Sequence, residues 1–258
     1  MIKITTSTIK VSYDDYMITK DNVIIPKVTV VDGNMFDIVR YLYNTGKKVT
    51  LHNFANNNRP GLYKISDMGD IYFTSHTQEE QLLRASMKSK KIFLDINQYL
   101  IYIEGKNSAL YTKDVLFCKD FITGFRVRRK QRFLANVCTS PAIQNPKVNP
   151  QTGKYENQVD KDSMLKRMML TLFLALRSDP PVADLNVRAG SLRQLARDSD
   201  VFITGCGAFN NPIQEVKDLW NTAIRSVLET AKEIIFVIYV GTRTISIWKD
   251  IEQSDRES

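Results

Sequence analysis

The pattern of apolar and polar positions along the chain predicts strands and helices in alternation. Residues 201–204 and 234–240 are short apolar runs, typical of strands that are buried on both faces of a sheet. Between them, residues 215–232 carry apolar side chains at helical spacing. Strands that alternate with helices in this way indicate an α/β fold in which helices cover both faces of the sheet.

The same patterns extend along the rest of the chain. Residues 2–13 and 23–31 are rich in β-branched side chains and are expected to be strands. The run from Asn56 to Gly61 is strong turn chemistry, so a loop is expected over 55–70. Further strands are expected over 48–54, 115–121 and 133–139, and a strand-rich segment over 92–103. Helices are expected over 35–43, 77–87, 161–178 and 192–197, and a polar loop over 145–155. Met168, Met169 and Leu170 are expected in the core.

The length of 258 residues suits one large domain or two small ones. The sequence has no internal repeat and no low-complexity tract. We expect a main domain over residues 48–252, with an N-terminal part over 1–47 whose strands and helix pack on it. A polar tail over 253–258 is expected to be frayed.

The composition is that of a soluble globular protein, with 43% hydrophobic and 25% charged residues. No apolar run approaches the ~18–20 residues that span a bilayer, and residues 1–20 lack the apolar centre of a secretory signal. Three widely spaced cysteines are typical of neither a disulfide framework nor a zinc site, and two histidines are too few for a histidine-rich one. We therefore expect an intracellular protein, cytoplasmic or nuclear and not secreted, with no metal and no cofactor.

The net charge of +8 suggests a polyanionic partner, such as nucleic acid, a nucleotide or phosphate. The densest group of cations is the segment from Arg126 to Arg132, which lies between two aromatic residues. This segment could contact nucleic acid, or it could be an ordinary solvated loop or strand face. The sequence leaves both interpretations open.

A glycine-containing turn joins the apolar run at 201–204 to the helix at 215–232. Gly205 and Gly207 lie directly after the strand, where glycines let backbone N–H groups come close to an anion. The turn has neither the dinucleotide-binding nor the Walker spacing. It is therefore either a phosphate-binding loop or a tight turn without a ligand.

Two adjacent carboxylates, Glu79 and Glu80, open the helix expected over 77–87. Such a pair could supply an acid and a hydrogen-bonding partner for cleavage of a glycosidic bond. The alternative is a capping box between Thr77 and Glu80, which is worth perhaps ~1 kcal/mol and occurs on many helices.

Polar residues also follow the strand expected over 48–54. Asn53 lies near its end, directly after His52, and Asn56 lies two residues beyond it. Their side chains could bind a sugar hydroxyl, or they could satisfy the backbone of the loop.

In order along the chain, these segments resemble the microbial-type poly(ADP-ribose) glycohydrolase family, a branch of the macrodomain fold. The likeness covers about residues 48–240 and depends on the order of several short motifs. The motifs are Asn53-Phe54-Ala55-Asn56, Pro60-Gly61, Gln78-Glu79-Glu80 with Leu83-Arg84 and Ser86, Asp114-Val115, Thr139-Ser140-Pro141-Ala142, Gly205-Cys206-Gly207-Ala208-Phe209, and Asn211-Pro212 with Glu215-Val216.

The resemblance implies a three-layer α/β/α macrodomain-like fold with a mixed sheet and an N-terminal β extension. It implies binding of ADP-ribose at the strand ends and cleavage of a ribose–ribose O-glycosidic bond. By similarity, Glu80 is the catalytic acid, Glu79 holds ribose hydroxyls, and Asn53 and Asn56 lie near the distal ribose, with Gln78 also at the ligand. The diphosphate would be wrapped by Gly205, Cys206, Gly207, Ala208 and Phe209, the last as a ring contact.

One motif departs from the family pattern. The family has three glycines shortly before its Gln-Glu-Glu, where this chain has Met68, Gly69 and Asp70, with residues 62–67 as an insertion. Gly69 is kept as an expected ligand-binding residue, but a carboxylate at Asp70 should weaken diphosphate binding or reshape the loop.

Three functions therefore remain open. The first is an enzyme that hydrolyses ADP-ribosyl glycosidic bonds. The second is a catalytically impaired macrodomain that binds or sequesters ADP-ribose or another NAD-derived nucleotide. The third is a basic nucleic-acid-binding protein on the same scaffold.

Overall fold

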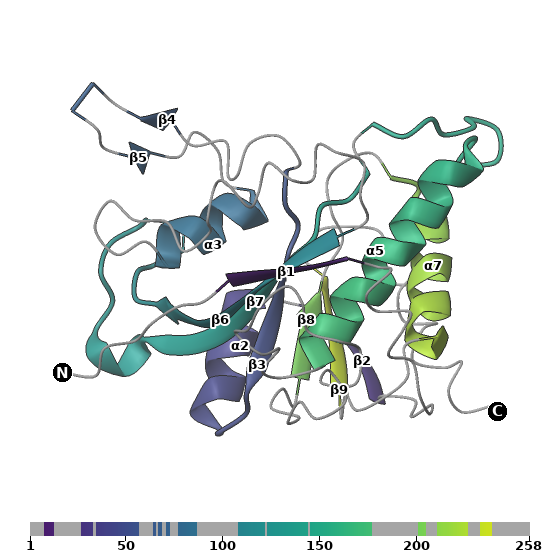
Figure 1. Ribbon diagram of the computed structural model, residues 1–258. Helices are drawn as coiled ribbons and strands as arrows, with labels where there is room; N and C mark the ends of the chain where they lie inside the picture. The colour runs from purple at the N-terminus through teal and green to yellow at the C-terminus, as the bar shows by residue number, and fades with distance from the viewer. Residues whose placement is uncertain are drawn as a thin grey trace.

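The computed structural model describes residues 8–12, 27–32, 35–56, 64–65, 67–68, 71–72, 77–86, 108–121, 123–143, 145–176, 201–204, 211–226 and 233–238. Within these ranges, seven strands form one sheet in the order β1-β6-β7-β3-β8-β9-β2 (Figure 1). The strands are β1 (Thr8–Ser12), β2 (Lys27–Asp32), β3 (Val49–Asn53), β6 (Ser108–Phe117), β7 (Phe133–Thr139), β8 (Val201–Thr204) and β9 (Glu233–Ile238).

The sheet is mixed. The run β7-β3-β8-β9-β2 is parallel, whereas β1, β6 and β7 pair antiparallel to one another. Because parallel strands run in one direction, the carboxyl ends of β7, β3, β8 and β9 meet at a common edge. In open α/β sheets this is the edge at which ligands usually bind.

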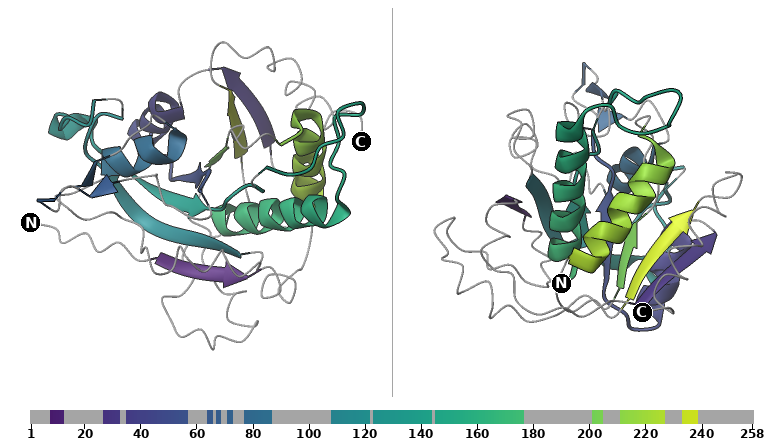
Figure 2. Two further views of the ribbon diagram at one scale, coloured as in Figure 1. Left: turned by 90° about the horizontal axis from the view of Figure 1, so that it is seen from above. Right: turned by 90° about the vertical axis from the view of Figure 1, so that its right-hand side faces the viewer.

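Helices cover both faces of the sheet. Helices α2 (Met35–Asn44) and α3 (Gln78–Ser86) pack against β3, β6 and β7 on one face. Helices α5 (Gln158–Leu176) and α7 (Ile213–Ser226) pack on the other face, and Figure 2 shows the two pairs on opposite sides. The predicted three-layer α/β/α arrangement with a mixed sheet is confirmed.

The core under α2 shows how the sequence pattern produces this packing. Phe36 and Val39, three residues apart, are buried against the sheet, while Asp37 and Tyr41 on the other side of the helix are exposed. From the sheet, Phe117 and Phe133 stack with their ring centroids 5.0 Å apart. On the opposite face Met168, Met169 and Leu170 of α5 are buried, as predicted.

Two expectations about secondary structure were wrong. The loop expected over 55–70 contains strand β4 (Lys64–Ile65), which pairs antiparallel with β5 (Ile71–Tyr72). The strand expected over 115–121 runs over Ser108–Phe117 instead: a bulge between Thr112 and Val115 interrupts the alternation near its start, and residues 118–121 lie beyond its end. Asp114 in this bulge has a φ of 53°, and its N–H donates to Asn136 Oδ1.

The two N-terminal strands belong to the same sheet and occupy its two edges. β1 pairs with β6, and β2 pairs with β9. The domain boundary between residues 47 and 48 stays a prediction. The segments expected over 92–103 and 192–197 lie outside the described residues. Within the described ranges, no helix combines the length and apolar character that crossing a membrane needs.

Candidate functional site

Two neighbouring parallel strands end in polar side chains that contact each other. Asn53 is the last residue of β3 and Thr139 is the last residue of β7, and both are fully buried. Asn53 Nδ2 donates to Thr139 Oγ1 at 3.2 Å, and the Ser140 N–H donates to the Asn53 carbonyl oxygen. Thr139 was not predicted as a site residue, although it opens the Thr139-Ser140-Pro141-Ala142 motif and ends a predicted strand.

Gln78 attaches the first turn of α3 to the end of β3. Its Oε1 accepts from the Phe54 N–H at 2.9 Å, and its Nε2 donates to the His52 carbonyl oxygen. The side-chain amide thus bonds to the strand backbone as a neighbouring strand would. These two contacts indicate that Gln78 positions the start of α3 on β3. The expected contact of Gln78 with a ligand stays a prediction.

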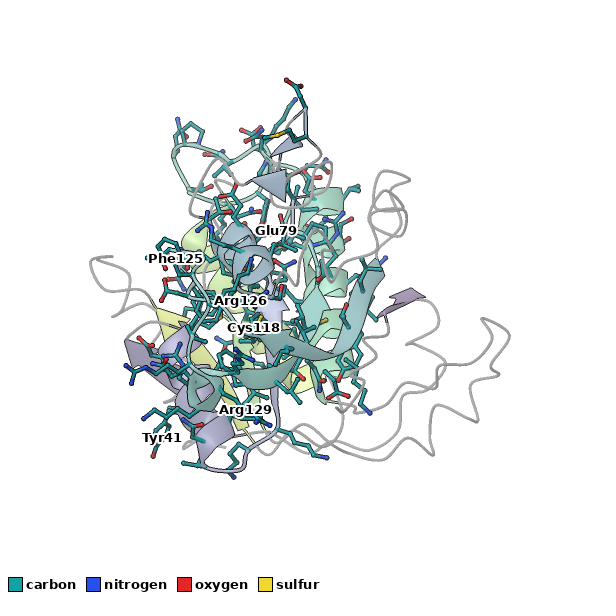
Figure 3. The ribbon with its side chains drawn as sticks, turned by 90° about the vertical axis from the view of Figure 1, so that its left-hand side faces the viewer. Tyr41, Glu79, Cys118, Phe125, Arg126 and Arg129 are labelled. Carbon is teal, nitrogen blue, oxygen red and sulfur yellow. The ribbon has the colours of Figure 1, made fainter. Side chains whose placement is uncertain are left out.

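Glu79 lies beside the end of β3 as a result. Its Oε1 accepts from Asn53 Nδ2 at 3.2 Å and its Oε2 accepts from the Asn56 N–H at 3.1 Å. Glu79, labelled in Figure 3, is almost completely buried. Asn53 Oδ1, which is also buried, has no hydrogen-bond partner among the described residues. Three residues expected at the site, Asn53, Asn56 and Glu79, are therefore brought together.

Glu80 points to a different partner. Its Oε2 accepts from the Thr77 N–H at 3.3 Å, which is the carboxylate half of the predicted capping box. The side chain is fully buried. A carboxylate has several acceptor positions, so this contact is compatible with a second role for Glu80.

His52 lies on β3 immediately before this polar group. Its ring packs against Phe54, with centroids 4.3 Å apart, and edge-on to Trp220. Its Nε2 is 3.3 Å from the Ser140 carbonyl oxygen, to which an N–H there donates. Burial lowers the pKa of His52 to about 4, although the bond to Ser140 acts in the opposite direction. The imidazole is therefore neutral at physiological pH and supports the strand end by packing.

A second polar cluster fixes the start of α7. Buried Glu215 pairs with Lys161 Nζ at 2.7 Å and accepts from the Tyr155 N–H. The Tyr155 hydroxyl donates to Asn211 Oδ1 at 2.6 Å, and Asn211 Nδ2 donates to the Ile143 carbonyl oxygen. Burial, followed by the nearby Glu215 carboxylate, raises the pKa of the Tyr155 phenol. This cluster holds the residue that directly follows the glycine turn, and no local pattern singled out Tyr155.

The expected phosphate-binding residues lie outside the described part of the chain. They are Gly69, Gly205, Cys206, Gly207, Ala208 and Phe209. The flanks of the turn are described: β8 ends at Thr204 and α7 begins at Ile213, so a strand and a helix border it as predicted. Next to Gly69, Met68 lies in the turn between β4 and β5 and is 81% exposed. Within the described ranges, no group of three or more His, Cys, Asp or Glu side chains is arranged to hold a metal ion.

The layers, the mixed sheet and the polar carboxyl edge define a macrodomain-like α/β protein. A scan against protein-family models and a search of curated proteins find no match. Among solved structures, the chain is similar to microbial poly(ADP-ribose) glycohydrolases.

The enzyme from Thermomonospora curvata aligns with a TM-score of 0.64 at 14% identity, over 95% of this chain and 85% of that one. The same enzyme bound to the inhibitor ADP-HPD gives a TM-score of 0.62 at 14% identity, over 94% and 84% of the two chains. The enzyme from Deinococcus radiodurans in complex with ADP-ribose gives a TM-score of 0.62 at 15% identity, over 96% and 94%. The chain therefore has the fold of these enzymes along nearly its whole length.

Proposed function

We propose that this protein hydrolyses ADP-ribosyl glycosidic bonds, such as the ribose–ribose linkages of poly(ADP-ribose). The observation that carries the proposal is the contact of Glu79 with Asn53 and Asn56 at the carboxyl edge of the sheet. The likeness to solved glycohydrolases, one of them in complex with ADP-ribose, supports it. The buried Asn53 Oδ1 adds an acceptor suited to a ribose hydroxyl, since a buried acceptor without a donor costs about 1–3 kcal/mol.

In this proposal Glu80 protonates the leaving ribose oxygen as the glycosidic bond breaks. Positive charge develops on the anomeric carbon, water adds there, and the proton that the water loses returns to the Glu80 carboxylate, which completes the hydrolysis and restores the acid. Glu79 accepts hydrogen bonds from ribose hydroxyls, with Asn53 and Asn56 beside the distal ribose. Gln78 positions both carboxylates. Backbone N–H groups in the turn of Gly205, Cys206, Gly207, Ala208 and Phe209 hold the diphosphate, and Gly69 is a further ligand-binding residue.

A second candidate is binding of ADP-ribose without turnover. The observation that favours it is Met68, the first of the three residues that stand where the family has glycines: it lies in the turn between β4 and β5 and is 81% exposed. Side chains there would hold the diphosphate farther from the backbone than glycines do. The carboxylates would then bind a nucleotide that the loop does not orient for cleavage.

Glu80→Gln distinguishes the two functions. Glutamine keeps the capping contact to Thr77 but cannot donate a carboxylic proton, so the fold and ADP-ribose binding should persist. If the protein is a hydrolase, turnover of poly(ADP-ribose) should fall by roughly 10²–10⁴-fold. Calorimetric titration with ADP-ribose and release of ADP-ribose from the polymer measure the two quantities, with Glu156→Gln at an exposed position as the control.

Each result has one meaning. Full turnover in Glu80→Gln would remove Glu80 from the mechanism. Binding by the wild type without turnover on any ADP-ribosyl substrate would establish the second candidate. Absence of ADP-ribose binding would overturn both.

A further inference from the structure

A strongly basic surface lies outside the candidate site. We define the basic surface as the five cations Arg126, Arg128, Arg129, Lys130 and Arg132, all of which are exposed. They fall within seven consecutive residues that include no acidic side chain. None of them makes an ion pair with a carboxylate in the described part of the chain. Their charge is therefore available to a partner in solution.

The backbone that carries these cations is ordered by its own hydrogen bonds. Arg126 forms a β-bridge with Lys119, and the Val127 N–H donates to the Cys118 carbonyl oxygen at 3.1 Å. A short 3₁₀ helix, η3 (Arg129–Gln131), follows, and Gln131 Oε1 accepts from the Arg128 N–H. The loop is held before any partner arrives, so binding loses little backbone entropy.

Exposed aromatic rings flank the basic surface on both sides. Phe125, directly before Arg126, is 77% exposed. On α2, Tyr41 is 67% exposed, and Tyr43 lies 6.3 Å from the ring of Phe133, the residue after Arg132. Figure 3 shows Phe125, Arg126, Arg129 and Tyr41 on one flank of the molecule, with Arg129 and Tyr41 farthest from Glu79.

We propose that the basic surface, with Phe125 and the tyrosines of α2, is a docking site for single-stranded nucleic acid. Such sites combine cations that follow the phosphate backbone with aromatic rings on which unpaired bases stack. A duplex hides the faces of its bases, so only a single strand would use both parts of this surface. The proposal does not depend on the candidate site. Phe133, next to Arg132, and Thr139 are the two ends of β7, so this end of the surface lies about 20 Å along the strand from Thr139.

The test measures binding of the full chain to a fluorescent single strand of about 20 nucleotides by anisotropy, at roughly 50 and 200 mM salt. The affinity of the wild type should fall steeply with salt. Arg128→Gln with Arg129→Gln should weaken binding and reduce the slope of log affinity against log salt by about 1.4, since each phosphate contact on a single strand contributes about 0.7. Phe125→Ala should weaken binding about fivefold or more at both salt concentrations without changing the slope.

A second double variant tests whether binding of the strand depends on this surface or only on the net charge of the protein. Lys147→Gln with Lys154→Gln removes the same charge from exposed positions on another loop and should leave binding unchanged. An equal loss in that variant would overturn the proposal, as would absence of binding by the wild type. Tighter binding to duplex or to phosphatidylserine vesicles, unaffected by Phe125→Ala, would assign the surface to another partner. Displacement of the strand by excess ADP-ribose would place it in the candidate site instead.

Discussion

His52 shows how one buried residue can make this fold sensitive to acid. Its ring is enclosed by Phe54 and Trp220, and burial lowers its pKa from 6.5 to about 4. The unfolded chain therefore takes up a proton at a pH where the folded chain does not. Stability is lost as the pH falls from about 6.5 toward 4, because protonation favours the unfolded state in that window.

The free energy of unfolding should be about 2 kcal/mol lower at pH 5 than at pH 7 because of His52 alone. Urea denaturation at the two pH values measures it. His52→Gln should start from a lower stability but lose most of the pH dependence. A pH dependence equal to that of the wild type would show that another group is responsible.

Among the secondary-structure elements, the contact between α3 and β3 determines where the carboxylates of Glu79 and Glu80 lie. Gln78 bonds to the backbone of His52 and Phe54, and the next residue, Glu79, then reaches Asn53 and Asn56. One amide side chain thus connects the helix start to the strand end. The orientation of the candidate site depends on this element contact as much as on the glutamates themselves.

Gln78→Ala should reduce the free energy of unfolding by about 2–4 kcal/mol, since it leaves two backbone groups near the strand end without a partner. Hydrogen exchange should show faster exchange of the Phe54 amide in particular. Gln158→Ala, in the exposed first turn of α5, is the matched control and should cost less than about 0.5 kcal/mol. Equal costs in the two variants would mean that Gln78 does not fix the helix.

The sequence predicted the elements better than it predicted the contacts between them. The bounds of β7 and β8 were predicted correctly because both are apolar runs that stop at Ser140 or Gly205. The start of β6 was missed because the bulge at Asp114 breaks the alternation on which strand prediction depends. The Thr77–Glu80 contact was accessible from spacing within one turn. The bond from Gln78 to a strand more than twenty residues away leaves no periodic signal, so only the fold shows it.

For the whole molecule, the candidate site lies at one end of β7 and the Arg132 end of the basic surface lies at the other. Thr139 belongs to the polar carboxyl edge, whereas Phe133 adjoins Arg132. Charges about 20 Å apart are separated by roughly two Debye lengths at physiological salt. The two regions should therefore respond independently to substitution.

Arg128→Gln with Arg129→Gln should leave the affinity for ADP-ribose unchanged at physiological salt, and a variant that also carries Glu80→Gln should bind ADP-ribose with the affinity of Glu80→Gln alone. Additivity is expected because sites more than about 10 Å apart without shared partners do not couple. Titration of each variant with ADP-ribose measures this. A change in ADP-ribose affinity caused by the surface substitutions would show that the nucleotide uses that flank of the molecule.

The pairing of β2 with β9 has a consequence for synthesis of the chain. These strands lie side by side in the sheet, yet Val28 is made about 200 residues before its partner Ile234. At roughly 5–20 residues per second, a ribosome needs about 10–40 s to bridge that interval. During this time β2 lacks the strand that it will pair with, and pairings of such long sequence separation also form slowly once the chain is released. The nascent chain therefore depends on β9, the last strand of the described residues, to complete the sheet edge at β2.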